Sequence, residues 1–170
     1  GFSAFEFSLF FGINALAIGL AAGLSVKFKN PEHAMFLGSV GMTIMSAVEF
    51  VILSNEYHFA VYEAVLFVLL FSMGLTFTAS TTLAMDCERA NSGTASALFG
   101  AAGFAFGGIV SPLVGLGDIL STTGLIFFVC SVCSLCFSVF AMNQTHTNLW
   151  GSFKCKMGPV ARFVFLRREK

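Results

Sequence analysis

Charged side chains are scarce in this sequence. Its 170 residues include nine lysines and arginines and nine aspartates and glutamates, so charged residues make up only 11%. An average soluble domain is about a quarter charged. Hydrophobic residues reach 56%, and 22 positions are phenylalanine. No soluble fold of this size can bury so much apolar surface, so the composition excludes a soluble globular protein.

The sequence also lacks the signatures of enzymes and secreted proteins. It contains no Walker loop, no His-Glu-x-x-His motif and no setting for a Ser-His-Asp triad. It opens without the basic start and cleavage site of a secretory signal, beginning with glycine in what reads as a loop, and we therefore expect a fragment. We expect no catalytic residue, no metal, no cofactor and no nucleic acid partner.

The sequence contains long apolar runs. Five runs of about twenty residues contain no lysine or arginine, which is the length that crosses a hydrocarbon core roughly 30 Å thick. They cover residues 7–26, 34–53, 59–85, 93–116 and 122–142. These runs predict an all-α membrane protein with five transmembrane helices in residues 1–142. The short connections predict that consecutive helices are antiparallel neighbours.

The basic residues predict the orientation of the chain. Lysine and arginine favour the cytoplasmic side of a membrane. If residue 1 lies outside, all nine basic residues fall in the inside loops, 27–33 and 86–92, or after residue 142, and the outside loops contain none. The C-terminus is then cytoplasmic. The basic tail, 143–170, is either an interfacial segment on an anionic leaflet or a disordered end, and the sequence leaves both open.

The fourth run is rich in glycine, which a helix in water tolerates poorly. Small residues fall within about 80° of one another along this helix, whereas larger side chains occupy the opposite arc. The small residues are Ser96, Gly100, Gly103, Gly107 and Ser111. Such a face allows close contact with a partner helix, and Pro112 is expected to kink the helix near its outer end. The face serves either static packing or the rocking of one bundle against another.

Two segments resemble a known family. "GTASALFGAAGFAFGGIVSPLVGL" resembles the eleventh helix of the bicyclomycin-resistance-like (Bcr/CflA-like) drug:proton antiporters of the major facilitator superfamily, and "FEFSLFFGINALAIGLAAGL" resembles the eighth. The loop "KFKNPEHAM" departs from that family because it lacks the expected glycine and arginine signature. The resemblance implies that the spans are helices eight to twelve of a C-terminal half in a bacterial cytoplasmic (inner) membrane.

The resemblance also implies alternating access between two six-helix halves, with a proton moving inward as a drug moves outward. The proton gradient is then the energy source. The implied partners are the missing N-terminal half, membrane lipids and a small-molecule drug. Helices eight, ten and eleven are implied to line the central cavity, and the chain alone is expected to be inactive.

Five residues are candidates for the substrate cavity: Asn14, Glu63, Phe71, Thr76 and Phe104. A polar side chain in hydrocarbon normally faces the bundle interior, so Asn14 either contacts substrate or bonds a neighbouring helix. Glu63 and also Glu49 lie near outer helix ends, where each either binds a proton or snorkels to the interface. Thr76 lines a wetted wall or bonds its own helix. Phe71 and Phe104 are candidates to stack on an aromatic drug.

The cysteines imitate an iron–sulfur motif without its context. Cys130, Cys133 and Cys136 have the C-x2-C-x2-C spacing, but they lie within an uncharged span with no fourth ligand beside them. We interpret them as small apolar packing residues.

The predicted function is therefore proton-coupled efflux of amphipathic drugs. One alternative is a sugar or metabolite exporter of the same superfamily. The other is a small non-transporting membrane protein that associates through its glycine-rich helix. The abundance of phenylalanine and the scarcity of buried Trp, Asn and Gln favour apolar cargo. An intramembrane enzyme is least favoured, because no catalytic pair lies at membrane depth.

Overall fold

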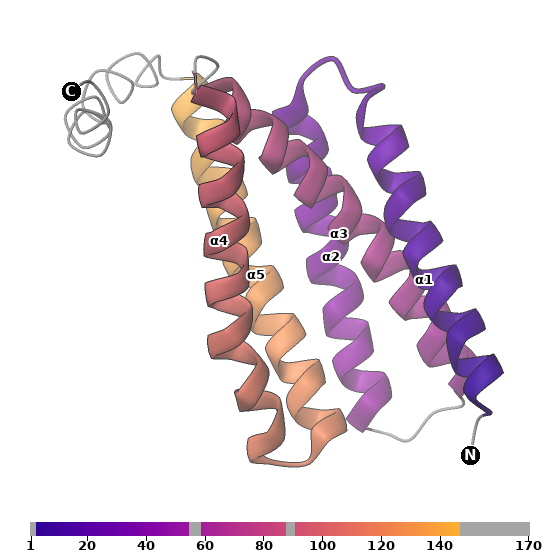
Figure 1. The fold of residues 1–170 in the computed structure, drawn as a ribbon. Helices are drawn as coiled ribbons and strands as arrows, with labels where there is room; N and C mark the ends of the chain where they lie inside the picture. Colours follow the sequence, from indigo (N-terminus) through magenta and orange to yellow (C-terminus); the bar gives the residue numbers. More distant parts are fainter. Residues whose placement is uncertain (1–2, 55–58, 88–90, 147–170) are drawn as a thin grey trace.

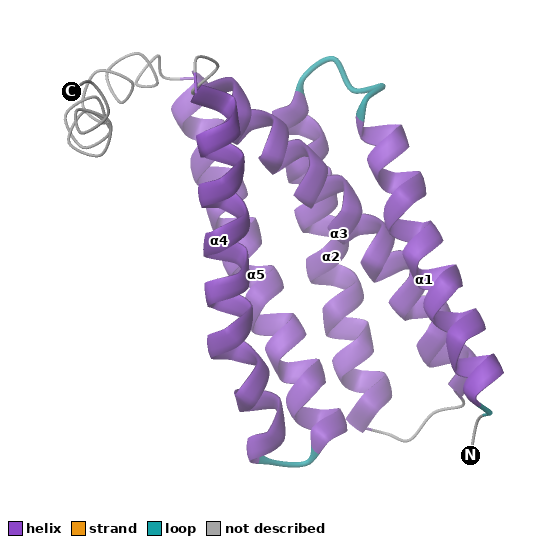
Figure 2. Cartoon of the chain, viewed as in Figure 1, coloured by secondary structure: helices purple, strands orange, loops and turns teal. Residues whose placement is uncertain are grey.

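The computed structural model describes residues 3–54, 59–87 and 91–146. Within these ranges the chain forms helices and loops and no strand (Figure 2). The helices are α1 (Ala4–Ser25), α2 (Pro31–Ser54), α3 (Phe59–Cys87), α4 (Ser92–Val110), the 3-10 helix η2 (Ser111–Leu116) and α5 (Ile119–His146). Five helices, counting α4 with η2 as one, are long and apolar enough to cross a membrane. The predicted all-α, multi-pass membrane protein is confirmed.

Local sequence explains where several helices begin. Ser3 and Glu6 form a reciprocal capping box at the start of α1, with the Ser3 N–H donating to Glu6 Oε2 at 2.7 Å. Pro31 is the first residue of α2, a position where its missing N–H is harmless. Asp118 precedes α5, and its Oδ2 accepts hydrogen bonds from the Ser121 backbone N–H and hydroxyl.

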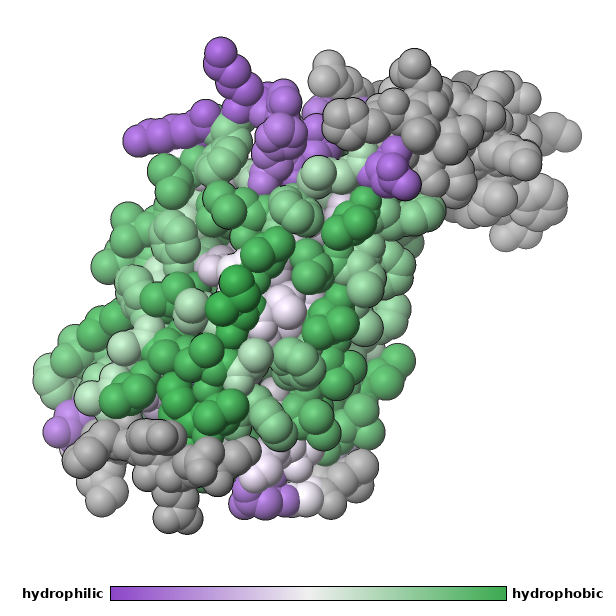
Figure 3. All heavy atoms as spheres, turned by 180° about the vertical axis from the view of Figure 1, so that it is seen from behind, coloured by the Kyte–Doolittle hydropathy of each residue, from purple (hydrophilic) through white to green (hydrophobic). Residues whose placement is uncertain are grey.

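Parts of the loops predicted to lie inside, and most of the tail, fall outside the described residues. These are positions 88–90, which include Arg89, and 147–170, which form most of the predicted basic tail. Lys27 and Lys29 are described, and both are exposed in the connection between α1 and α2. A band of apolar side chains separates the hydrophilic groups at the two ends of the face drawn in Figure 3.

The helices do not pair in chain order. α4 and α5 stand at one side of the bundle and α1 at the other, with α2 and α3 between them (Figure 1). The main contacts join α2 to α3, α2 to α5, and α1 to α3. The expectation that consecutive helices are antiparallel neighbours holds for α2 with α3, for α3 with α4 and, through η2, for the fourth span with α5, but it is wrong for α1, which packs on α3 rather than on α2. The reason is that small and hydroxyl side chains, rather than loop length, determine which helix surfaces fit together.

The interior is built from small residues, and the large apolar residues face outward. Alanines and serines predominate among the buried side chains, whereas no phenylalanine of the described residues is buried and ten are exposed. Phe104 is 86% exposed and Phe137 is 75% exposed. Lipid tails are as apolar as leucine, so large side chains gain little from leaving them, while small ones let backbones approach. This distribution is the one expected of a protein whose solvent is a bilayer.

Two contact surfaces show this close approach. A methyl group added at Gly74 on α3 would lie 2.8 Å from Ala21 Cβ and 2.9 Å from the Ile18 carbonyl oxygen, both on α1. One added at Gly38 on α2 would lie 2.8 Å from the Ser72 carbonyl oxygen on α3. Such distances leave no room for a side chain, so these glycines let α3 pack closely against α1 and α2.

Hydroxyl groups join α2 to α5. Ser39 Oγ donates to Ser138 Oγ at 2.9 Å, and Ser46 Oγ lies 2.6 Å from Ser131 Oγ. Between them, Thr43 Oγ1 donates to the Ser131 carbonyl oxygen at 3.2 Å. We call these five residues the hydroxyl ladder. The ladder satisfies buried polar groups and ties α5 into the bundle.

The glycine-rich helix α4 has no buried residue. It touches α3 through its bulky arc, where the Phe99 and Phe77 rings lie 5.8 Å apart. The small residues point elsewhere: a methyl group added at Gly100, Gly103 or Gly107 would meet nothing within 4 Å. Within the part of the chain that the structure describes, the small face is unoccupied, and its predicted role in packing stays a prediction.

The helix changes its hydrogen bonding at the position where Pro112 was expected to kink it. α4 ends at Val110, and the 3-10 helix η2 begins at Ser111, whose N–H still donates to the Gly107 carbonyl. Pro112 has no N–H and cannot continue the α-helical pattern. The end of this span that was predicted to lie outside is therefore a 3-10 helix.

Candidate functional site

Two of the five cavity candidates meet in one pocket. Asn14 lies midway along α1 and Glu63 lies in the second turn of α3, and the Asn14 side-chain Nδ2 donates to Glu63 Oε1 at 2.9 Å. The residues are 49 positions apart in the chain, and the packing of α1 on α3 brings them together. The sequence indicated each residue but not the pair.

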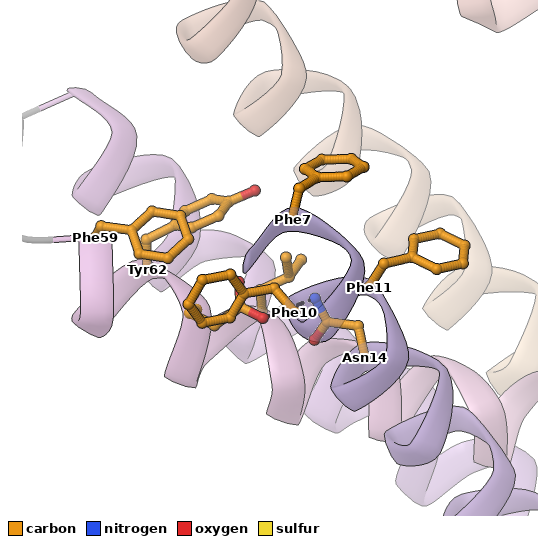
Figure 4. A pocket seen from close by; sticks show the side chains of 8 residues that line it. Phe7, Phe10, Phe11, Asn14, Phe59 and Tyr62 are labelled. Atoms are coloured by element: carbon orange, nitrogen blue, oxygen red, sulfur yellow. Dashed lines mark hydrogen bonds between the residues drawn. The ribbon is translucent and has the colours of Figure 1, made fainter. Parts of the chain in front are cut away.

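The pocket around this pair has a volume of about 380 Å³ and is mostly aromatic (Figure 4). Its lining consists of Phe7, Phe10, Phe11, Asn14, Phe59, Tyr62, Glu63 and Leu66. Phe10 and Phe59 meet edge to face, with ring centroids 5.0 Å apart, and the Tyr62 ring lies 6.0 Å from that of Phe59. A few polar groups set in an apolar cleft are typical of small-molecule sites.

One polar atom of the pocket pair is left without a partner. Asn14 Oδ1 is buried and makes no hydrogen bond within the described residues. A buried acceptor without a partner is costly, because it has lost water and gained nothing in return. A bound molecule carrying an N–H or O–H group would satisfy it. The Asn14 amide thus presents a free acceptor beside the Glu63 carboxylate.

The other three cavity candidates lie away from this pocket. The Thr76 hydroxyl donates to the Ser72 carbonyl oxygen of its own helix at 3.1 Å, and the side chain packs against Gly38 of α2. Phe71 is half-buried on α3, and Phe104 projects from α4. The pocket contains neither Phe71 nor Phe104. The aromatic lining comes from other phenylalanines, which the sequence did not distinguish from the rest.

The sequence left two alternatives for Glu49, proton binding or snorkelling to the interface, and its burial disfavours snorkelling. Its exposed fraction is 0%, and it is the largest fully buried side chain of the described chain. A carboxyl group that is fully covered by the bundle does not extend to the membrane surface. Sequence reasoning could not choose between the alternatives, because the face of α2 that turns inward is set by packing.

The cysteines are not part of the packed interior. Cys130, Cys133 and Cys136 all lie on the exposed surface of α5, as free thiols. The interpretation as packing residues therefore does not hold within the described part of the chain, where the serines of α5 occupy the inward face instead.

The geometry can be compared with known proteins. The chain is 34% identical over 136 residues to YdgK of Bacillus subtilis, an uncharacterized MFS-type transporter. The match covers 78% of this chain and 34% of the relative, so the chain spans about a third of the length of the curated relative that it matches. No family model and no solved structure matches. This similarity, together with the five long apolar helices, supports membership of the major facilitator superfamily.

Proposed function

We propose that this chain is part of a proton-coupled exporter of amphipathic drugs, a Bcr/CflA-like antiporter of the bacterial cytoplasmic membrane. The observation that supports the proposal is the aromatic pocket with its single amide–carboxylate pair, Asn14 and Glu63. An amphipathic molecule needs both of these surfaces. The aromatic rings accept its apolar body, and the polar pair orients its polar group.

The pocket chemistry favours a substrate with a positively charged or hydrogen-bond-donating group. The Glu63 carboxylate attracts a cation, and the Asn14 Oδ1 atom accepts a hydrogen bond. Phenylalanine and tyrosine faces add cation–π attraction. A sugar would need many more hydrogen-bonding partners than Asn14, Tyr62 and Glu63 provide. Drug export is therefore favoured over sugar export.

Transport by alternating access would require the rest of the transporter. We place this chain in the C-terminal half, as helices eight to twelve, and propose the N-terminal half as its partner. The relative's greater length leaves room for such a half. The small face of α4 has the shape that a helix of another bundle could approach closely and slide against.

Drug susceptibility tests the role of the pocket. In cells that express the gene carrying this chain, Asn14→Ala and Glu63→Gln should each reduce resistance at least several-fold at normal protein levels. The matched controls are Asn30→Ala and Glu32→Gln, which change the same residue types at positions outside the pocket. Unchanged resistance in both pocket variants would remove the pocket from the substrate pathway and the proposal with it.

Labelling tests the proposed orientation, with residue 1 outside and the C-terminus cytoplasmic. The test uses a chain whose native cysteines are replaced and an impermeant maleimide applied to intact cells. The Gly115→Cys variant, at an exposed position near the outer end of its span, should be labelled. The Lys27→Cys variant should be labelled only after the cells are opened. The reverse result would invert the topology and exclude export in the proposed direction.

A further inference from the structure

The buried carboxyl group of Glu49 lies outside the pocket and has no partner. Its exposed fraction is 0%, and neither Oε1 nor Oε2 makes a hydrogen bond. The structure otherwise satisfies its buried hydroxyls, as the ladder between α2 and α5 shows. Glu49 is thus the one buried acid among the described residues whose two side-chain oxygens are both unsatisfied.

No cationic side chain is available to neutralise Glu49 within the described chain. The basic side chains that the structure describes are Lys27, Lys29 and His33, and they lie before α2 or in its first turn. Glu49 is 18 residues into that helix, about 27 Å from its start at 1.5 Å per residue. An unpaired carboxylate in a medium of low dielectric constant is very costly. A proton removes that cost and needs no additional space.

The neighbours of Glu49 also disfavour a second negative charge. Two titratable groups of α3, Tyr62 and Glu63, are close enough to Glu49 to interact with it electrostatically. Glu63 accepts the hydrogen bond from Asn14 and lines the pocket. The titratable side chains described on α5, the other helix packed on α2, are the three exposed cysteines. Two adjacent carboxylates avoid simultaneous ionisation.

We propose that Glu49 is a proton-binding site of this protein. The proton binds to one carboxylate oxygen and converts the charged group to a neutral carboxyl while α2 is packed on α3 as seen here. Opening of that packing lets water reach the group, which then releases the proton. The site lies close enough to Glu63 for the two groups to interact electrostatically. A cationic substrate bound beside Glu63 would therefore affect the affinity of Glu49 for its proton, and the proton would affect the affinity for the substrate. Only this last, coupling step rests on the proposed drug export.

Infrared spectroscopy tests proton binding directly. The full chain in lipid vesicles should show the C=O stretch of a protonated carboxyl at neutral pH, and the band should shift on transfer to heavy water. Glu49→Gln should abolish the band, whereas Glu63→Gln and Glu32→Gln should retain it. Absence of the band at neutral pH, or its persistence in Glu49→Gln, would overturn the proposal. Circular dichroism checks that each variant is helical. If Glu49→Gln fails to fold, the same infrared measurement is made on Glu49→Asp, which keeps a carboxyl group.

A transport measurement separates this inference from the proposed function. Glu49→Gln resembles the permanently protonated side chain, so it should make drug resistance insensitive to the pH gradient while Glu32→Gln leaves the dependence intact. If the infrared band is lost in Glu49→Gln but no variant affects drug resistance, the proton site is supported and the proposed drug export is contradicted. If the pocket variants reduce resistance but the unchanged protein shows no such band, drug export is supported and the proton site is contradicted.

Discussion

At the scale of single residues, the protein reverses the arrangement of a soluble domain. Serines and a glutamate are buried, and phenylalanines face outward. In a bilayer the outward phenylalanines incur no cost, whereas every inward polar group must find a partner or a role. The serines have partners in the hydroxyl ladder and in carbonyls of their own helices. Glu49 and the Asn14 Oδ1 atom do not, so they are the positions where function is expected.

Asp118 provides a prediction about pH. The Ser121 backbone N–H, and then its hydroxyl, donate to the Asp118 carboxylate and lower its pKa below the usual value. A group whose pKa is lowered by folding contributes stability above its unfolded pKa, and that contribution disappears as the pH falls through the folded pKa. The start of α5 should therefore loosen only in acid, below the ordinary titration range of aspartate.

Nuclear magnetic resonance of the chain in micelles measures this effect. The Ser121 amide proton should shift as Asp118 is protonated, at a pH lower than for an unperturbed aspartate. Asp118→Asn keeps an oxygen acceptor that does not titrate, so the same amide should show no such transition. A transition at or above the usual pH for aspartate would show that the cap is not formed.

The sequence identified Asn14 and Glu63 because a polar residue in an apolar run is conspicuous. It did not reveal that they bond to each other, since α1 and α3 become neighbours only through packing. Nor did it separate Glu63, which lines a pocket, from Glu49, which is buried. Both lie near helix ends in the sequence. Only the rotation of each helix about its axis distinguishes them.

At the scale of helices, length was predictable and pairing was not. The run predicted at 34–53 corresponds to α2 at Pro31–Ser54, because hydropathy alone determines where a chain enters and leaves a bilayer. Each helix is apolar all round, so the sequence carries little information about its inward face. The spacing of Ser39, Thr43 and Ser46 at intervals of four and three was a usable signal, since it places three hydroxyls on one face of α2.

The hydroxyl ladder leads to a prediction about the pairing of α2 with α5. Ser46 and Ser131 are both buried, and their hydroxyl oxygens lie 2.6 Å apart. Each single change to alanine should destabilise the chain by about 1 kcal/mol, and the pair should couple by about 0.6 kcal/mol, the average for hydrogen bonds between membrane helices. A double-mutant cycle of reversible unfolding in micelles measures both quantities.

The control for this cycle is Ser8→Ala. Ser8 is exposed on α1, and its hydroxyl bonds only the Ala4 carbonyl oxygen of the same helix. This change should leave the free energy of unfolding nearly unaltered. Strictly additive effects of Ser46→Ala and Ser131→Ala would mean that the two hydroxyls do not interact across the helices.

At the scale of the whole molecule, the glycines fall into two groups. Gly38 and Gly74 lie in contacts where no side chain fits, and they let α3 pack closely against α1 and α2. Gly100, Gly103 and Gly107 form a face with open space around it. Membrane helices associate through small residues, so an open small face suits contact with the N-terminal half that we propose as the partner. Replacing a glycine of each group by leucine distinguishes packing within the chain from contact with a partner.

Gly74→Leu should lower the stability of the isolated chain, whereas Gly103→Leu should leave that stability unchanged and act only on drug resistance in cells. Gly74→Leu forces a side chain against α1 and should destabilise the isolated chain by about 1–3 kcal/mol, the usual cost of overpacking. Gly103→Leu meets nothing within 4 Å and should leave unfolding of the isolated chain unchanged. In cells it should abolish drug resistance, because the face can no longer approach its partner. Unaltered resistance in Gly103→Leu would mean that the small face contacts lipid. If chemical cross-linking gives a dimer of the unchanged chain and Gly103→Leu abolishes that dimer, the partner is a second copy of the chain.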